Sequence, residues 1–145
     1  MKSSIVVPVV LVAIFTLAGG LFSAPELDPN DLDITLNGYG YGINTLTAKN
    51  LIVDDWYLIF ADEDVYATGD IDVFVENVRV IDDSVATGNA YSWKATATSK
   101  EVYVEVVGGT DGDHWGLWLF FDDNRDGLVD AGDDMLDAAA VECID

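Results

Sequence analysis

Two segments of this chain alternate apolar and polar residues with a period of two. Ile71, Val73 and Val75 take every second position in one segment, and valines alternate with Glu101, Tyr103 and Glu105 in the other. Because successive side chains of a β-strand point to opposite faces, such a segment buries one face and leaves the other in water. The pattern predicts antiparallel sheets with one solvated face each.

Further strands are predicted where β-branched and aromatic residues cluster between glycine- and asparagine-containing turns. These segments are residues 34–36, 39–48, 51–60, 89–98 and 115–121. Seven or eight short strands indicate an all-β fold, which we expect to be an antiparallel, jelly-roll-like β-sandwich. Residues 134–142 allow either a short helix with an apolar stripe or a last strand.

The segment between Asp122 and Asp133 places oxygen ligands where a twelve-residue calcium loop needs them. Side chains at positions 1, 3, 5, 9 and 12 and the carbonyl of position 7 surround the ion in such a loop, and Gly at position 6 makes the sharp turn. Gly127 takes the sixth position here, and Asp133 stands where a longer Glu is usual. The predicted Ca²⁺ ligands are Asp122, Asn124, Asp126, Leu128 through its carbonyl, Asp130 and Asp133.

The aromatic run 115–121 before the loop reads as a strand and not as the first helix of an EF-hand. Residues 118–133 therefore resemble the strand-plus-calcium-loop of the B-type repeats in serine-aspartate surface proteins, and dockerin and EF-hand loops are related. The resemblance implies calcium binding and a surface setting. It covers about sixteen residues, and the rest of the chain carries no such likeness.

The amino-terminal segment predicts export. Residues 5–22 contain no charged side chain, and Lys2 precedes them. We interpret residues 1–24 as a cleaved signal peptide or as one hydrophobic helix retained as a membrane or filament anchor, so membrane contact is confined to residues 5–22. Residues 25–33 are rich in proline and aspartate and read as a connector, and residues 34–145 as the sandwich. Either way, the acidic domain is expected to be extracellular or at the cell surface.

The charge of the chain excludes one large class of partner. Asp and Glu number 27 against 6 Lys and Arg, giving a formal net charge of −21. Long-range repulsion would oppose binding to nucleic-acid phosphates or to an anionic membrane surface. Divalent cations and basic partners suit such a surface.

A catalytic site is not predicted. The chain has one histidine and one cysteine, and neither His114 nor Cys143 lies in a recognisable motif, so we expect no enzyme activity. His114 reads as an exposed turn residue, with metal ligation as the alternative. Because Cys143 cannot pair within the chain, it reads as a buried apolar residue, with an intermolecular disulfide as the alternative.

The sequence favours a non-catalytic, calcium-binding structural subunit of the cell surface that self-assembles in a pilus-like filament or a surface layer, or associates with other surface proteins. Residues 31–41 could donate a strand to a neighbouring subunit or pair within their own domain. The alternative function is a secreted carbohydrate-binding module. Its aromatic platform would use pairs that otherwise belong to the core, namely Tyr39 with Tyr41, Trp56 with Tyr57, and Tyr91 with Trp93.

Overall fold

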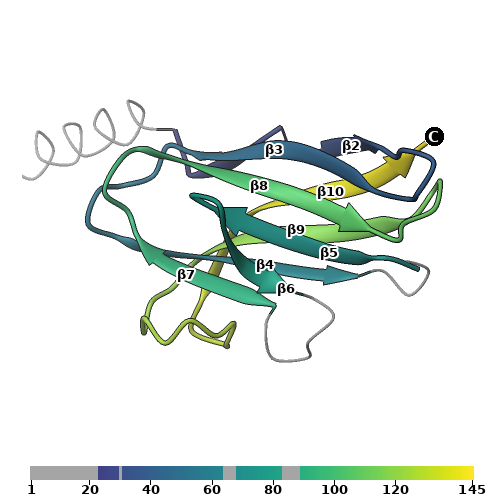
Figure 1. The fold of residues 1–145 in the computed structure, drawn as a ribbon. Helices are drawn as coiled ribbons and strands as arrows, with labels where there is room; N and C mark the ends of the chain where they lie inside the picture. Colours follow the sequence, from purple (N-terminus) through teal and green to yellow (C-terminus); the bar gives the residue numbers. More distant parts are fainter. Residues whose placement is uncertain (1–22, 30, 64–67, 83–88) are drawn as a thin grey trace, which may run out of the picture.

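The computed structural model describes residues 23–29, 31–63, 68–82 and 89–145, which form two β-sheets packed face to face (Figure 1). The first sheet, sheet A, has the strand order β1-β3-β8-β5-β6, and the second, sheet B, has the order β2-β10-β9-β4-β7. The strands are β1 (Glu26–Asp28), β2 (Asp31–Thr35), β3 (Gly42–Lys49), β4 (Trp56–Glu63), β5 (Asp70–Val75), β6 (Val78–Asp82), β7 (Ala90–Lys94), β8 (Ser99–Val107), β9 (His114–Phe121) and β10 (Asp134–Ile144).

The predicted β-sandwich is confirmed, but its topology is not that of a jelly roll. The orders β1-β3-β8-β5 and β10-β9-β4 correspond to the two sheets of an immunoglobulin-type sandwich. One pairing also departs from the expected antiparallel pattern, because β2 runs parallel to β10 at the edge of sheet B. A sequence period of two reveals strands but does not encode which strand pairs with which.

The core lies between the sheets and is built by the alternation seen in the sequence. Ile71, Val73 and Val75 of β5 are buried, as are the three alternating valines of β8. From sheet B, Trp115 and Leu117 of β9 contribute their side chains to the same cluster. The residues between the valines of β8, Glu101, Tyr103 and Glu105, are exposed or partly exposed, as the pattern predicted, whereas Asp72 of β5 is buried.

The sandwich begins earlier than predicted. Residues 25–33 were expected to form a solvated connector, but they include β1 and the start of β2, and Leu27 and Leu32 are fully buried. Leu27 pairs with Ala48 in sheet A, whereas Leu32 lies opposite Val141 in sheet B. The two leucines therefore anchor this segment to both sheets, despite the prolines and aspartates around them.

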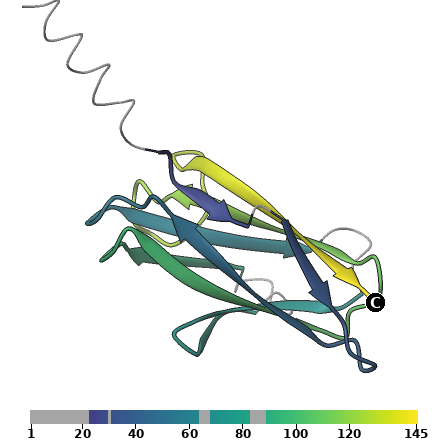
Figure 2. The same ribbon diagram turned by 90° about the horizontal axis from the view of Figure 1, so that it is seen from above.

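The segment proposed as a donated strand pairs within its own chain. β2 aligns with the carboxyl-terminal half of β10, with Ile34 opposite Cys143, and the two strands run side by side towards the carboxyl terminus (Figure 2). Of the two alternatives for residues 31–41, the structure shows the intradomain pairing.

The carboxyl-terminal segment is a strand and not a helix. Ala139, Val141 and Cys143 of β10 alternate into the core, and a register shift between Met135 and Asp137 marks an irregularity near the start of the strand. The predicted signal or anchor helix lies almost wholly in residues 1–22, outside the described residues. Within the described ranges, no helix has the length and apolar character needed to cross a bilayer.

Candidate calcium site

The predicted calcium loop connects β9 to β10 and lies at one end of sheet B, close to β7 (Figure 1). The two strands form an antiparallel hairpin in which Phe121 pairs with Asp134, so the loop begins and ends at one place. The amide of Asp122 donates to the carbonyl of Trp56 on β4, at 3.0 Å, which fixes the first loop residue to the sheet. The rigid hairpin therefore determines where the loop carboxylates can gather.

Asp122 is the buried member of the predicted ligand set, with 1% of its surface exposed. Its Oδ2 accepts a hydrogen bond from the hydroxyl of Ser92 and another from the amide of Gly127, at 3.3 Å. Its Oδ1 is also buried but has no hydrogen-bond partner among the described residues. Since a buried polar atom without a partner carries a desolvation cost, this oxygen has an unmet requirement for a donor or a cation.

Gly127 makes the sharp turn that the sequence pattern requires. Its φ is 74°, in the left-handed region that glycine adopts without a steric cost. The turn brings the Gly127 amide back onto the carboxylate of Asp122, five residues earlier. The predicted role of glycine at the sixth loop position is therefore met.

Three further predicted ligands meet on the outer side of the loop. The amide nitrogen of Asn124 lies 3.1 Å from Oδ2 of Asp126 and 2.6 Å from Oδ2 of Asp130. The two carboxylates thus converge on one NH₂ group, which offers them partial positive charge. A half-turn of this amide would break the hydrogen bond that the Asp126 amide donates to Oδ1 of Asn124, at 3.1 Å, and would present three oxygens to a cation.

The remaining carboxylate oxygens are held by the loop backbone. Asp126 Oδ1 accepts from the amide of Leu128 at 2.8 Å, and Asp130 Oδ1 accepts from Gly132 at 2.7 Å. Asp133 accepts from the amides of Asp123 and Asp130, at 3.2 and 3.0 Å. These turns order the loop and orient its side chains.

The loop is consequently folded, but its ligands are not gathered around a single point. In the part of the chain that the structure describes, no three His, Cys, Asp or Glu side chains are grouped closely enough to hold a metal ion as they stand. The structure brings Asn124, Asp126 and Asp130 together, and it holds Asp122 and Asp133 through separate hydrogen bonds. A bound ion would require rotations about side-chain bonds, while the backbone turn at Gly127 is already in place.

The single histidine and the single cysteine lie away from this loop. His114 is half-exposed at the start of β9, and its Nε2 is 3.8 Å from a carboxylate oxygen of Glu142. Cys143 is a buried free thiol in the core, as predicted. Burial, reinforced by neighbouring carboxylates, raises the pKa of the Cys143 thiol to about 11, so the group is a poor nucleophile at neutral pH.

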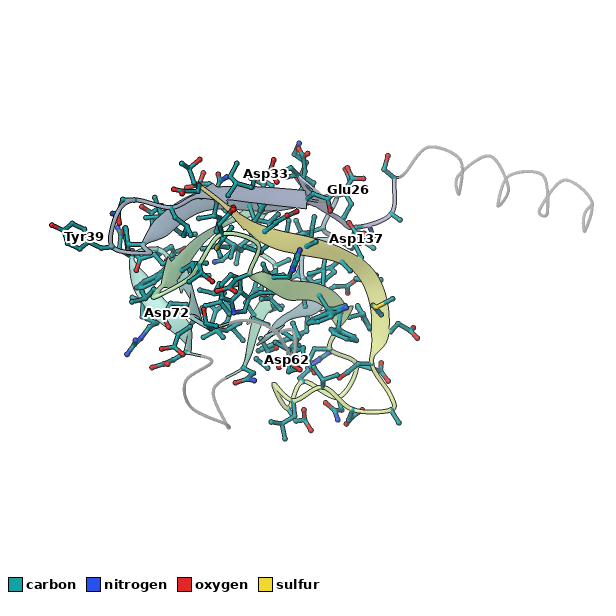
Figure 3. The ribbon with its side chains drawn as sticks, turned by 90° about the vertical axis from the view of Figure 1, so that its right-hand side faces the viewer. Glu26, Asp33, Tyr39, Asp62, Asp72 and Asp137 are labelled. Atoms are coloured by element: carbon teal, nitrogen blue, oxygen red, sulfur yellow. The ribbon has the colours of Figure 1, made fainter. Side chains whose placement is uncertain are left out.

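Three of the six aromatic residues considered for sugar binding lie in or against the core. Tyr57 and Trp93 are buried with ring centroids 5.9 Å apart, and Tyr91 stacks on Trp93. Tyr39 is 92% exposed and points away from the sandwich (Figure 3), whereas the hydroxyl of Tyr41 donates to Glu105. The core interpretation is therefore confirmed for Tyr57, Tyr91 and Trp93, which are not available to the alternative sugar-binding platform.

Ser92 is the residue that sequence analysis missed. It lies on β7, opposite Leu58 of β4, on the same outer face of sheet B as Asp122. Nothing in its local sequence indicates a site, because its position depends on the β7–β4–β9 register. The alternation of Tyr91 and Trp93 towards the core could have shown that Ser92 points outward, but not what it contacts.

Comparison with known proteins supports the fold alone. No protein-family model matches the chain, and no curated protein matches it. The N-terminal domain of PorA has a TM-score of 0.50 at 8% identity, over 78% of this chain and 84% of that chain. WR4, an MSP family member of C. elegans, has a TM-score of 0.45 at 12% identity, over 84% of this chain and 97% of that chain. The class 5 fimbriae chaperone CfaA has a TM-score of 0.42 at 12% identity, over 81% of this chain and 55% of that chain.

Proposed function

We propose that this chain is an exported, non-catalytic structural subunit of the cell surface whose sandwich is stabilised by Ca²⁺ bound in the loop between β9 and β10. The observation that carries the calcium proposal is the Asp122 carboxylate. It is buried, it belongs to the first position of the ligand pattern, and its Oδ1 has no hydrogen-bond partner among the described residues. A calcium ion bound at this oxygen would offset the cost of burying it.

The charge of the loop supports the same proposal. Residues 122–133 contain five aspartates against one arginine. The carboxylates of Asp126 and Asp130 approach one another through the Asn124 amide, which carries no full charge. A divalent cation would replace that weak attraction with a full charge and satisfy the preference of Ca²⁺ for hard oxygen ligands.

A calcium ion would also supply stability that this exported domain cannot obtain from a disulfide. Cys143 is the only cysteine of the chain. Ligand binding to the folded state alone adds about 2.7 kcal/mol at a hundred times Kd, which is a substantial fraction of the usual stability of a domain.

Self-assembly at the cell surface is the part of the proposal that rests on the amino-terminal segment. The uncharged stretch 5–22 leads directly to Ser23, where the described chain begins. Beside this point, an apolar hollow is lined by Pro25, Leu51 and Ile52, and Ile52 is 60% exposed. An apolar segment that joins the domain at an apolar hollow suits an anchor or a packing contact with another copy.

Thermal melts of the full-length protein at low salt, with Ca²⁺ and with a chelator, test the proposed function. We expect a higher melting temperature with calcium, and we expect Asp126→Ala to remove most of that difference. Asp33→Ala is the matched control, because Asp33 carries the same charge on edge strand β2, on the sheet edge opposite β7. Coincident melts for the wild type would refute the calcium proposal.

A further inference from the structure

We infer that Ser92 couples the calcium loop to β7, so that ion binding stabilises an edge strand of sheet B. This inference rests on the proposed function and extends it to a positioning residue outside the loop. β7 pairs only with β4 in the described sheet, and its other side is an edge. An edge strand presents unpaired backbone groups, and its stability determines whether those groups remain fixed or become available to another chain.

The contact that carries the coupling is the hydrogen bond from the Ser92 hydroxyl to Oδ2 of Asp122. The same oxygen accepts from the Gly127 amide at 3.3 Å. With Oδ2 held by two donors, Asp122 cannot turn away, and Oδ1 is left as the oxygen available to an ion. Ser92 therefore fixes the orientation of a first-position ligand without contributing a charge.

The loop also rests directly against this strand. A Cβ atom added at Gly127 would lie 3.7 Å from the Cβ of Ser92, in ordinary van der Waals contact, so the turn of the loop lies next to β7. Tyr91 and Trp93, the neighbours of Ser92, face the core, and Trp93 is buried. β7 is thus held on its inner face by aromatic packing and on its outer face by the loop.

Binding of Ca²⁺ would strengthen the outer attachment. An ion that draws Asp122, Asn124, Asp126 and Asp130 together restricts the loop, and the restriction passes to β7 through the single hydroxyl of Ser92. Partners that orient metal ligands typically change metal affinity by about 10- to 100-fold when they are removed. The same loss is expected here for Ser92→Ala.

Calorimetric titration of Ca²⁺ into full-length wild type, Ser92→Ala, Ser92→Thr and Ser99→Ala tests this inference. We expect a loss of affinity of about tenfold or more for Ser92→Ala. Ser92→Thr keeps the hydroxyl and should bind within about threefold of the wild type. Ser99→Ala removes an exposed hydroxyl from the start of β8 and should bind as the wild type does.

Hydrogen–deuterium exchange of residues 89–95 in the wild type gives a second readout that does not depend on any variant folding. Calcium should slow exchange in this peptide, and Ser92→Ala should reduce that protection. Unchanged affinity of Ser92→Ala, or exchange of β7 that calcium does not alter in the wild type, would overturn the coupling while leaving calcium binding intact. Absence of any calcium binding by the wild type would overturn both proposals.

Discussion

Strand β9 is bounded by two buried aspartates that have opposite surroundings. Asp113 precedes the strand and is 5% exposed, and Asp122 follows it and is 1% exposed. Around Asp113, both carboxylate oxygens accept hydrogen bonds, from the hydroxyls and amides of Thr68 and Thr110, at 2.8 to 3.2 Å. Around Asp122, two donors reach one oxygen and none of the described residues reaches the other.

The two aspartates therefore differ in whether both carboxylate oxygens have hydrogen-bond partners among the described residues. Burial works to raise the pKa of Asp113, but the donors of Thr110 and Thr68 outweigh it and hold that pKa below its usual value. The folded state therefore favours the charged form of Asp113. The ligand spacing of the calcium loop selects Asp122 and not Asp113, but the sequence does not show that Asp113 is buried and fully hydrogen-bonded.

The largest expected effect comes from neutralising each aspartate in turn, in calcium-free buffer. Asp113→Asn should lower the free energy of unfolding by about 2–4 kcal/mol, because hydrogen bonds to a charged group are lost and buried donors are mismatched. Asp122→Asn should be neutral or slightly stabilising, because it removes a buried charge that is only half-satisfied. Denaturant unfolding with a chelator present measures both.

The stability of the protein at low pH gives a second test of the role of the Asp113 carboxylate. Since the pKa of Asp113 is lower in the folded state, its charged carboxylate stabilises the fold at pH values above the unfolded-state pKa of about 3.9. This stabilisation is lost as the pH falls through the folded-state pKa. The acid-induced loss of stability should therefore be smaller in Asp113→Asn than in the wild type. An equal acid dependence in the two proteins would show that the threonine donors do not stabilise the charged form.

Raising the pH is expected to lower the stability of the fold by a somewhat smaller amount, through Cys143. This residue lies next to Asp113, because its amide donates a hydrogen bond to the Asp113 carbonyl. Because the pKa of Cys143 is raised from 9.0 to about 11, its protonated thiol stabilises the folded state fully below pH 9, and this stabilisation is lost as the pH rises towards 11. The loss amounts to about 2–3 kcal/mol at most. Unfolding of Cys143→Ala should have a shallower slope between these pH values than that of the wild type.

The smallest effect concerns Asp72 of β5, a third buried aspartate, whose Oδ1 also has no hydrogen-bond partner among the described residues. Burial raises its pKa, and the ion pair with Arg79, at 3.2 Å, offsets this only in part. At neutral pH, Asp72→Asn should therefore change stability by less than about 1 kcal/mol, towards greater stability. Calcium should not alter this result, because the ion pair is present without it. A calcium-dependent difference between the two proteins would identify Asp72 as part of a second site.

The sequence predicted the strands and the loop better than it predicted their connections. Alternation identified β5 and β8 because each buries one face, and Gly127 has the positive φ that the loop pattern requires. The predicted start of the sandwich at residue 34 was too late, because single leucines at positions 27 and 32 are the only apolar signal among prolines and aspartates. Neither the immunoglobulin-type order nor the parallel β2–β10 pair follows from periodicity, since both depend on long-range register.

At the candidate site, too, the sequence predicted the residues that lie close together in the chain and missed the contact that only the folded sheet creates. Spacing alone selected Asp122, Asn124, Asp126, Asp130 and Asp133, because calcium loops are encoded by consecutive residues. Ser92 could not be selected in this way, since thirty residues separate it from Asp122 and only the sheet brings the two together. The convergence of Asp126 and Asp130 on Asn124 likewise depends on turns that spacing does not specify.

Calorimetric titration of Ca²⁺ into the full-length wild type and Asp122→Asn at low salt tests whether Asp122 is a calcium ligand. We expect saturable binding in the wild type and at least a tenfold loss of affinity in Asp122→Asn, because Oδ1 of Asp122 is buried and has no hydrogen-bond partner among the described residues. Absence of saturable binding by the wild type, or equal affinity in the two proteins, would contradict this expectation.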